Sequence, residues 1–305
     1  MKAETGSLTI SRDDLDLDHT LAPGQSFRWR RDDLGRWTGV VGKRIVRIER
    51  DGSEIRWEVV PGGVEPGFIE SYLRLDVNLD RLYRDFAKAD GRIVEAIREY
   101  RGLRVLRQPP EETLLSYICS TANSVPRISG AIEAMSRLYG DFIGEMDGRE
   151  YYAFPSAEAL ARGDADDLRS LCGLGFRGAN LRSVAAQLLE RPVGWLDSLR
   201  DADYRTARAE VFQIWGVGCK IADCVLLFSL DKDQAFPVDT HVRRMAVKHY
   251  LPEFREKTLT HAVYEAIVDH FQRKFGPYAG WAQEYLFYYD LLRRKPPKEE
   301  PICSP

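Results

Sequence analysis

The stretch FQIWGVGCKIADCVLLFSLDKDQAFPVDTH, from Phe212 to His241, decides the fold of this chain and most of its chemistry. Two glycines, Gly216 and Gly218, separate two segments whose apolar residues recur at helical spacing. Two helices joined by such a turn form a helix-hairpin-helix. Glycine permits backbone conformations closed to other residues and lets N–H groups approach a phosphate. The turn therefore predicts either a DNA phosphate contact or a plain helix–helix corner.

Lys220 follows this turn directly and stands at the predicted start of the next helix. The positive end of a helix dipole disfavours a cation there, and together with partial burial it lowers the pKa of an amine. A shift of three pKa units corresponds to roughly 4 kcal/mol of differential interaction. The position indicates an amine nucleophile, and the alternative is a surface lysine at an unfavourable helix position.

Asp239 and the segment near residue 283 are further candidates. Asp239 precedes Thr240 at a predicted helix start, where an aspartate is a good N-cap and stays ionised. Such a carboxylate can stabilise positive charge on a sugar, although most aspartates at this position only cap. On a helix, Gln283, Phe287 and Asp290 share one face. This face suits hydrogen bonding and stacking with a base, or it belongs to an aromatic core helix.

Composition describes an ordinary globular protein. The chain has 305 residues, with 44% hydrophobic and 30% charged residues and a net charge of −3. The charge neither requires nor excludes a nucleic-acid partner. No apolar run reaches membrane-spanning length, and the first residues lack a signal-peptide pattern, so an intracellular protein is expected. The five cysteines form no CxxC pair, which predicts reduced thiols and neither a disulfide framework, a zinc site nor an iron–sulfur cluster.

The residue pattern predicts an α+β protein. Residues 8–62 show strand alternation and a hairpin turn at Asp51-Gly52, with strands expected at 26–31, 37–41, 44–50 and 54–60. From residue 68 onward the pattern is helical, with helices expected over 68–75, 80–100, 111–139, 155–171, 180–190, 204–214, 220–230, 240–250, 259–275 and 278–292. We therefore expect a small antiparallel β-sheet domain with flanking helices over 1–106, an all-helical domain over 107–293, and a disordered tail over 294–305.

Six motifs in a fixed order resemble the 8-oxoguanine DNA glycosylases of the helix-hairpin-helix (HhH-GPD) superfamily. They are PGQSFRW (23–29), LLSYICS (114–120), LGFRG (174–178), GVGCKIADC (216–224), QAFPVDTH (234–241) and GPYAGWAQ (276–283). The resemblance covers nearly the whole chain. It implies a bifunctional DNA glycosylase and abasic-site lyase that excises 8-oxoguanine by base flipping and acts on double-stranded DNA. Nothing in the sequence suggests more than a monomer.

The resemblance also implies roles for the base pocket. Lys220 falls on the catalytic lysine and Asp239 on the essential aspartate. Gly24 falls on the glycine whose carbonyl accepts from N7–H of 8-oxoguanine, and Gln283 on the residue that contacts the Watson–Crick edge. The stack around the flipped base falls on Cys224 and Phe287.

Further roles concern the DNA around that base. Phe176 falls on the aromatic wedge that fills the gap in the duplex. The contacts to the orphaned cytosine fall on Asn123, Arg127 and Arg177. Phosphate contacts fall on Gly216, Gly218 and His241, with Asp290 as the carboxylate partner of that histidine. The resemblance implies no required cofactor. It implies a possible hairpin cation held by the carbonyls of Phe212, Ile214 and Val217.

The chain departs from the family pattern at three positions. Ala122 lacks one usual contact on the cytosine side, which leaves the strictness of opposite-base choice open. Trp215 replaces a common proline of the hairpin, and Cys219 replaces a usual threonine. Two alternatives remain: a glycosylase for another base, or a DNA-binding module without chemistry. The co-occurrence of Lys220, Asp239 and Gln283 argues against the binding module, and the lone C-terminal cysteine argues against an iron–sulfur glycosylase.

Overall fold

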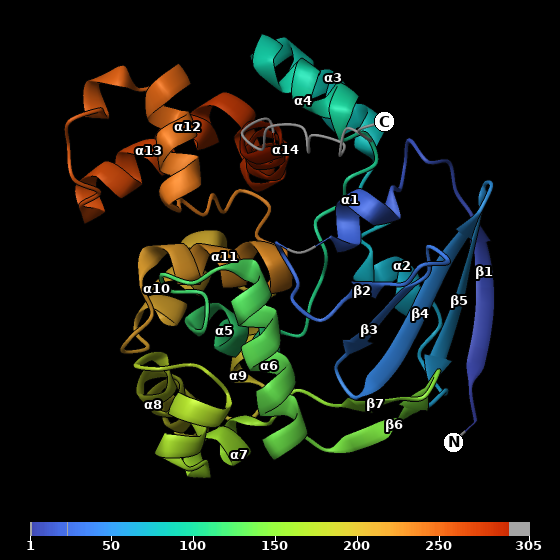
Figure 1. Cartoon of the computed structure of the whole chain (residues 1–305). Coiled ribbons are helices and arrows are strands. Elements are labelled where there is room, and N and C mark those ends of the chain that lie inside the picture. The colour runs from blue at the N-terminus through green and yellow to red at the C-terminus, as the bar shows by residue number, and fades with distance from the viewer. Residues whose placement is uncertain (1, 23, 293–305) are drawn as a thin grey trace, which may run out of the picture.

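The computed structural model describes residues 2–22 and 24–292 and shows a twisted sheet beside a larger body of helices (Figure 1). The strands are β1 (Glu4–Thr9), β2 (Arg30–Arg31), β3 (Trp37–Val41), β4 (Arg44–Asp51) and β5 (Glu54–Val60). They form an antiparallel sheet in the order β1-β5-β4-β3-β2. The predicted antiparallel domain is confirmed, although only Arg30–Arg31 of the predicted strand 26–31 pairs with the sheet.

One face of the sheet is covered by short helices. Alternation along β5 buries Ile55 and Val59, and the neighbouring strand β4 contributes Val46 and Ile48. These side chains pack with residues of α1 (Leu17–Leu21) and α2 (Phe68–Tyr72) in one apolar cluster. Burial of this face against helices is what makes the register of the strands specific.

The rest of the described chain is mostly helical. Its α-helices are α3 (Leu79–Ala89), α4 (Gly91–Glu99), α5 (Pro110–Ile118), α6 (Val125–Tyr139), α7 (Ala157–Arg162), α8 (Arg177–Leu189), α9 (Trp195–Ser198), α10 (Tyr204–Phe212), α11 (Cys219–Ser229), α12 (Thr240–His249), α13 (His261–Phe275) and α14 (Ala279–Leu292). Three short helical turns, η1 (Asp167–Leu171), η2 (Pro252–Phe254) and η3 (Gly276–Tyr278), lie between them. The predicted tail 294–305 lies outside the described residues.

A hairpin that the sequence analysis missed interrupts the helices. Strands β6 (Phe142–Met146) and β7 (Arg149–Tyr152) pair antiparallel around Asp147-Gly148, both with positive φ. Aspartate followed by glycine is a strong hairpin signal, so this turn was predictable. The hairpin lies along the sheet (Figure 1), where its Ile143 and Met146 pack with Val40 and Ile45. The second domain is therefore not entirely helical.

Helices α3 and α4 belong to the helical core although they precede residue 106. Leu82 and Phe86 of α3 and Ile93 of α4 share one apolar cluster with the helices from α5 onward. Helix α4 packs against α14, and α3 against α13. The domain boundary between residues 106 and 107 stays a prediction.

The buried side chain of Gln25 ties the N-terminal segment to the strand-like stretch before α5. Its Nε2 donates to the carbonyls of Thr20 and Arg104 at 2.9 and 2.8 Å, and its Oε1 accepts from the Leu106 amide at 2.8 Å. Gln108 in turn donates to the carbonyl of Gln25 at 2.7 Å. The neighbouring Gly24 is thereby held at a defined place beside α5.

Replacing Gln25 by leucine should lower the free energy of unfolding by about 3 kcal/mol, because three buried backbone groups lose their partners. Urea unfolding at equilibrium measures this difference. The matched control is Gln213→Leu at an exposed position, which should change stability by less than about 0.5 kcal/mol. Equal stability of the two variants would show that the Gln25 amide is dispensable.

Candidate active site

The helix-hairpin-helix is formed by α10, the loop 213–218 and α11, as predicted. Gly216 has φ +93°, and a Cβ there would lie 2.2 Å from Oδ1 of Asn180. Gln187 of α8 accepts from the amide of Trp215 at 2.8 Å and donates to its carbonyl at 3.1 Å. The loop is thus held from α8. Within the described residues no side chain caps the start of α11, so its first N–H groups suit an anion such as a phosphate.

Lys220 lies on the first turn of α11, and its amine has two defined neighbours. The Nζ donates to Oγ of Ser120 at 3.0 Å and lies 4.6 Å from the centre of the Tyr117 ring. A cation above an aromatic face is attracted by the ring quadrupole. The end of α5 therefore fixes where the amine of Lys220 lies.

Tyr117 connects Lys220 to the N-terminal domain. Its hydroxyl donates to the carbonyls of Gly24 and Gln25 at 3.2 and 3.3 Å, and its ring stacks on Phe228. Burial raises the pKa of Tyr117, and the nearby ionisable groups of Cys224, Glu284, Tyr288 and Asp239 raise it further. The hydroxyl therefore stays protonated and keeps donating to these carbonyls.

Two carboxyl groups, those of Asp239 at the start of α12 and Glu284 on α14, influence each other electrostatically. Asp239 is the N-cap of this helix and accepts from the Val242 amide at 2.7 Å, as predicted. Burial raises the pKa of Glu284 to about 8, with a further rise from Asp239 and an opposing hydrogen bond from Gln283. A carboxyl group whose pKa is raised in this way stays largely protonated near neutral pH, so Glu284 can donate a hydrogen bond.

Helix α14 contributes polar atoms that are buried without a partner. Among the described residues, neither Oε1 of Gln283 nor the hydroxyl of Tyr288 has a hydrogen-bond partner. The Tyr288 hydroxyl lies 2.7 Å from where a Cβ on Gly24 would be, so a larger residue there would displace this hydroxyl. Buried atoms of this kind are costly unless a ligand satisfies them. They mark a place built for a polar ligand.

The remaining predicted pocket residues lie on α11, α12 and α14. Burial raises the pKa of Cys224 to about 12, so its thiol stays neutral. The ring of Phe287 is half-buried and makes an edge contact with His241, at 6.2 Å between centroids. Nδ1 of His241 has no hydrogen-bond partner within the described ranges. Asp290 lies 3.9 Å from Arg92, and its predicted pairing with His241 stays a prediction.

The predicted wedge residue, Phe176, is 70% exposed and precedes α8. The guanidinium of Arg177 lies 4.5 Å from its ring and donates to the carbonyls of Thr121 and Ala122. Ala122 has φ +48°, an uncommon conformation for a residue with a Cβ. Arg177 therefore binds the loop that follows α5 and supports Phe176 at the surface.

Two other predicted DNA contacts flank this loop. The side chain of Asn123 donates to the carbonyl of Cys119 at 3.2 Å and accepts from the Ser124 amide at 3.0 Å. Arg127 is exposed on the first turn of α6. In the hairpin, the carbonyl of Ile214 accepts from the amide of Val217 at 3.0 Å, and the predicted cation there stays untested.

The structure thus brings Gly24, Lys220, Cys224 and Asp239 around Tyr117, and it adds four residues that the sequence analysis did not assign. Tyr117 and Ser120 lie within the motif LLSYICS, so their motif was noticed without a role for them. Glu284 and Tyr288 lie on α14 beside Gln283 and Phe287. Their position on an aromatic helix hid them, because only the fold reveals that a carboxyl and a hydroxyl are buried there.

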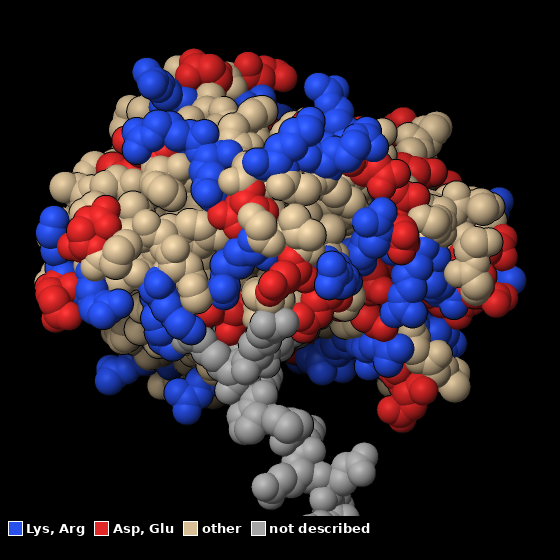
Figure 2. Space-filling model, turned by 90° about the horizontal axis from the view of Figure 1, so that it is seen from above, with Lys and Arg blue, Asp and Glu red and all other residues tan. Residues whose placement is uncertain are grey.

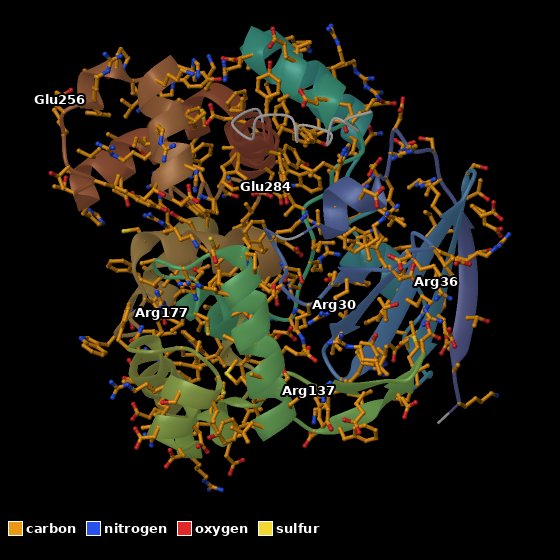
Figure 3. All side chains as sticks on the ribbon, viewed as in Figure 1. Arg30, Arg36, Arg137, Arg177, Glu256 and Glu284 are labelled. Carbon is orange, nitrogen blue, oxygen red and sulfur yellow. The ribbon has the colours of Figure 1, made fainter. Side chains whose placement is uncertain are left out.

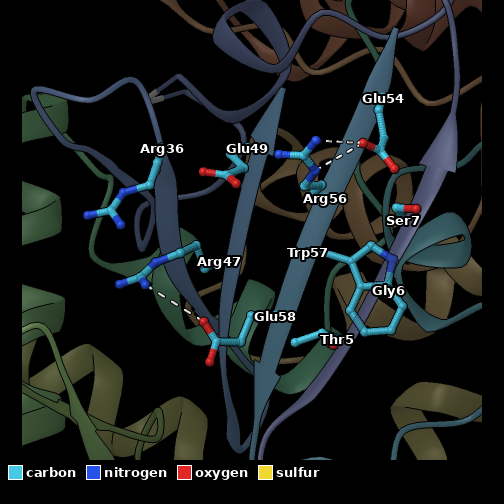
Figure 4. A pocket seen from close by; sticks show the side chains of 10 residues that line it. All are labelled: Thr5, Gly6, Ser7, Arg36, Arg47, Glu49, Glu54, Arg56, Trp57 and Glu58. Carbon is cyan, nitrogen blue, oxygen red and sulfur yellow. Dashed lines mark hydrogen bonds and ion pairs between the residues drawn. The ribbon is translucent and has the colours of Figure 1, made fainter. Parts of the chain in front are cut away.

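A hollow of about 490 Å³ lies on the outer face of the sheet (Figure 4). Its charged side chains pair with one another: Arg56 with Glu54 at 2.9 Å and Arg47 with Glu58 at 3.7 Å. None of the predicted site residues lines it. On the face seen from above, basic and acidic side chains are interspersed (Figure 2). Charge distribution on these two surfaces does not locate a ligand.

Comparison with known proteins agrees with this geometry. Residues 7–114 match the family described as 8-oxoguanine DNA glycosylase, N-terminal domain. Residues 115–267 match the HhH-GPD superfamily base excision DNA repair proteins. The chain belongs to the 8-oxoguanine DNA glycosylases of this superfamily.

Its similarity to individual members extends over both domains. The N-glycosylase/DNA lyase OGG1 of Arabidopsis thaliana is 35% identical over 94% of this chain and 80% of the relative. The N-glycosylase/DNA lyase of Saccharomyces cerevisiae is 32% identical over 95% of this chain and 87% of the relative. A solved structure that is similar is Clostridium acetobutylicum 8-oxoguanine glycosylase/lyase in complex with double-stranded DNA containing cytosine opposite 8-oxoguanine. The TM-score is 0.81 and the sequence identity 28%, and the match covers 92% of this chain and 93% of that structure. In the described part of this glycosylase, no helix has the length and apolar character to cross a bilayer.

The buried Glu284 predicts a specific pH dependence of stability. Its pKa is about 8 in the folded protein, against an ordinary value near 4.5. Below that ordinary value the carboxyl is protonated in both the folded and the unfolded protein, so its burial carries no cost from ionisation. As pH rises, the unfolded chain ionises first, so the cost grows until about pH 8. Glu284→Gln should therefore raise Tm progressively, relative to the unsubstituted protein, between pH 5 and pH 8.

Calorimetry at the two pH values measures this effect. Glu256→Gln is the matched control: Glu256 is exposed on the loop before α13, whereas Glu284 lies near the centre of the molecule (Figure 3). A Tm difference for Glu284→Gln that is the same at both pH values would contradict a buried, protonated carboxyl.

Proposed function

We propose that this glycosylase excises 8-oxoguanine from duplex DNA opposite cytosine, through a Schiff base formed by Lys220. The curated relatives act as N-glycosylases and DNA lyases, and excision of 8-oxoguanine with lyase activity is the function of this chain. The observation that carries the mechanism is the amine of Lys220, held by Ser120 and by Tyr117, whose hydroxyl also contacts the carbonyl of Gly24.

The chemistry requires a free amine near the sugar. The Nζ of Lys220 attacks C1′, the bond from C1′ to N9 breaks, and its electron pair leaves with the base, which takes up a proton. Loss of a proton from the nitrogen and opening of the sugar ring give the Schiff base, and β-elimination then cleaves the strand. The carboxylate of Asp239 stabilises the positive charge that develops on the sugar as the base departs.

Base choice rests on the atoms that the free protein leaves unpaired. The carbonyl of Gly24 has a second lone pair beyond the one used by Tyr117, and it accepts from N7–H of 8-oxoguanine. Guanine presents a lone pair at N7 and is repelled. Gln283 offers its free Oε1 to the Watson–Crick edge, while Cys224 and Phe287 enclose the base. Buried groups of this kind discriminate strongly, because the wrong base leaves them unpaired.

The DNA outside the pocket is held by surface elements. Phe176 enters the gap left by the flipped base, and Asn123, Arg127 and Arg177 contact the orphaned cytosine. The N–H groups around Gly216 and Gly218 and the imidazole of His241 contact phosphates, with Asp290 orienting the imidazole. A hairpin cation held by the carbonyls of Phe212, Ile214 and Val217 would support a phosphate; no other cofactor is required. We further propose that a single copy of the chain acts, in the compartment that holds the DNA.

The substitution Lys220→Gln tests the nucleophile. It should reduce single-turnover excision of 8-oxoguanine at least about 1,000-fold and abolish borohydride trapping, because no amine remains to attack. The Kd for the same duplex should stay within about threefold. Lys88→Gln, at an exposed lysine of α3, is the control. Retained excision by Lys220→Gln would remove Lys220 from the mechanism.

The substitution Asp239→Asn separates the charge of this residue from its role as a cap. Asparagine is an equally good N-cap, so the urea midpoint should stay unchanged. Loss of the carboxylate should slow the single-turnover rate at least about 100-fold with little change in DNA binding. An unchanged rate at the same midpoint would leave Asp239 only a structural role.

Arg127→Ala tests opposite-base recognition. Single-turnover rates on 8-oxoguanine paired with each of the four bases should converge, with cytosine losing about tenfold of its advantage. Arg92→Ala, on α4 near Asp290, is an arginine control outside the proposed cytosine contact. If the four rates keep their ratios in Arg127→Ala, the cytosine contact lies elsewhere.

A further inference from the structure

We propose that Cys219, His261 and Glu265 form a zinc-binding site on the surface between α11 and α13. Their possible ligand atoms, one sulfur, one nitrogen and one oxygen, all lie within 4.8 Å of one another. The cysteine pattern alone predicted no zinc site, because the ligands come from helices far apart in sequence. The site is independent of the proposed base-excision mechanism.

The backbone arrangement suits a tetrahedral metal. His261 and Glu265 are one turn apart on α13, with 3.6 Å between Nε2 and Oε1. Cys219 faces them from the first residue of α11. Ligand atoms around tetrahedral zinc are separated by roughly 3.5 Å. The His261 side chain is 65% exposed, so a small rotation closes the remaining distance.

Arg208 orients the carboxylate ligand. Its guanidinium donates to both oxygens of Glu265, at 2.8 and 3.0 Å, and to both oxygens of Asp223, at 2.8 and 3.1 Å. Each carboxylate oxygen keeps a further lone pair for a metal. Hydrogen-bonded carboxylates are usual in metal sites, where the outer partner fixes the geometry of the ligand.

Charge around the site favours a divalent cation. Asp223 and Glu265 share the single guanidinium of Arg208, which leaves one negative charge in excess. Metal binding releases the thiol proton of Cys219 to solvent, and the thiolate that remains adds a second negative charge. The two other charged residues that line the adjoining hollow, Arg205 and Asp269, have opposite signs. One Zn²⁺ would therefore neutralise the cluster.

The hollow gives the metal access to solvent. It has a volume of about 270 Å³, and Cys219, His261 and Glu265 all line it. A water molecule can complete the tetrahedron as the fourth ligand. Because thiolate and imidazole ligands select zinc over magnesium or calcium, this site differs in chemistry from a hairpin cation held by carbonyls. A bound metal would join the first turn of α11, next to Lys220, to the start of α13.

Cobalt titration of the full-length, reduced protein tests the proposal. One Co²⁺ per chain should produce a sulfur-to-cobalt absorption band in the near ultraviolet, and Zn²⁺ should displace it. Cys219→Ser should remove the band and weaken Zn²⁺ binding on the order of 100-fold, measured by competition with a chromophoric chelator. Cys172→Ser, at another free cysteine, should keep both properties.

His261→Gln provides a second variant at an exposed position, where folding is not at risk. It should also weaken Zn²⁺ binding at least tenfold. The proposal is overturned if the unsubstituted protein shows no sulfur band, or if the band and the Zn²⁺ affinity persist in either Cys219→Ser or His261→Gln. These readouts do not depend on DNA or on excision, so failure here leaves the proposed function untouched.

Discussion

The active site depends on the buried amide of Gln25. Two of its three hydrogen bonds hold the segment that carries Gly24 against residues 104–106, which lead into α5, and the third binds the carbonyl of Thr20. From there Tyr117 reaches back to the Gly24 carbonyl and forward to Lys220. One side chain from the small domain thus aligns a base-recognition atom with a nucleophile from the helical domain. A shift of this segment would move the Gly24 carbonyl away from the Lys220 amine, so base recognition and nucleophilic attack would no longer be aligned.

The pocket also contains buried polar groups that lower the stability of the folded protein. Gln283 and Tyr288 keep buried atoms without partners among the described residues, and Glu284 is buried within the electrostatic influence of Asp239. Such groups lower stability, and proteins retain them mainly where function requires them. The large aromatic core around α14, with Trp281, Tyr285 and Tyr289 fully buried, offsets this cost. The rigid helix then holds the unpaired atoms in place for a ligand.

Local patterns in the sequence predicted the local features of this structure. Strand alternation and turn residues located the sheet, and the glycine turn located the hairpin with Lys220 at the start of α11. The contact from Tyr117 to Gly24 joins residues 93 positions apart, so no periodicity reveals it. The hairpin at Asp147-Gly148 carries its signal in the turn alone, because its strands have only five and four residues and show little alternation.

The most direct measurement is mass-spectrometric mapping of the adduct trapped by borohydride on a duplex that carries 8-oxoguanine opposite cytosine. The reduced Schiff base joins the DNA sugar to one amine, and proteolysis identifies the peptide that carries it. The account predicts a single modified residue, Lys220, in the peptide that spans the start of α11. An adduct on another lysine or on the N-terminal amine, formed at the rate of excision, would contradict it.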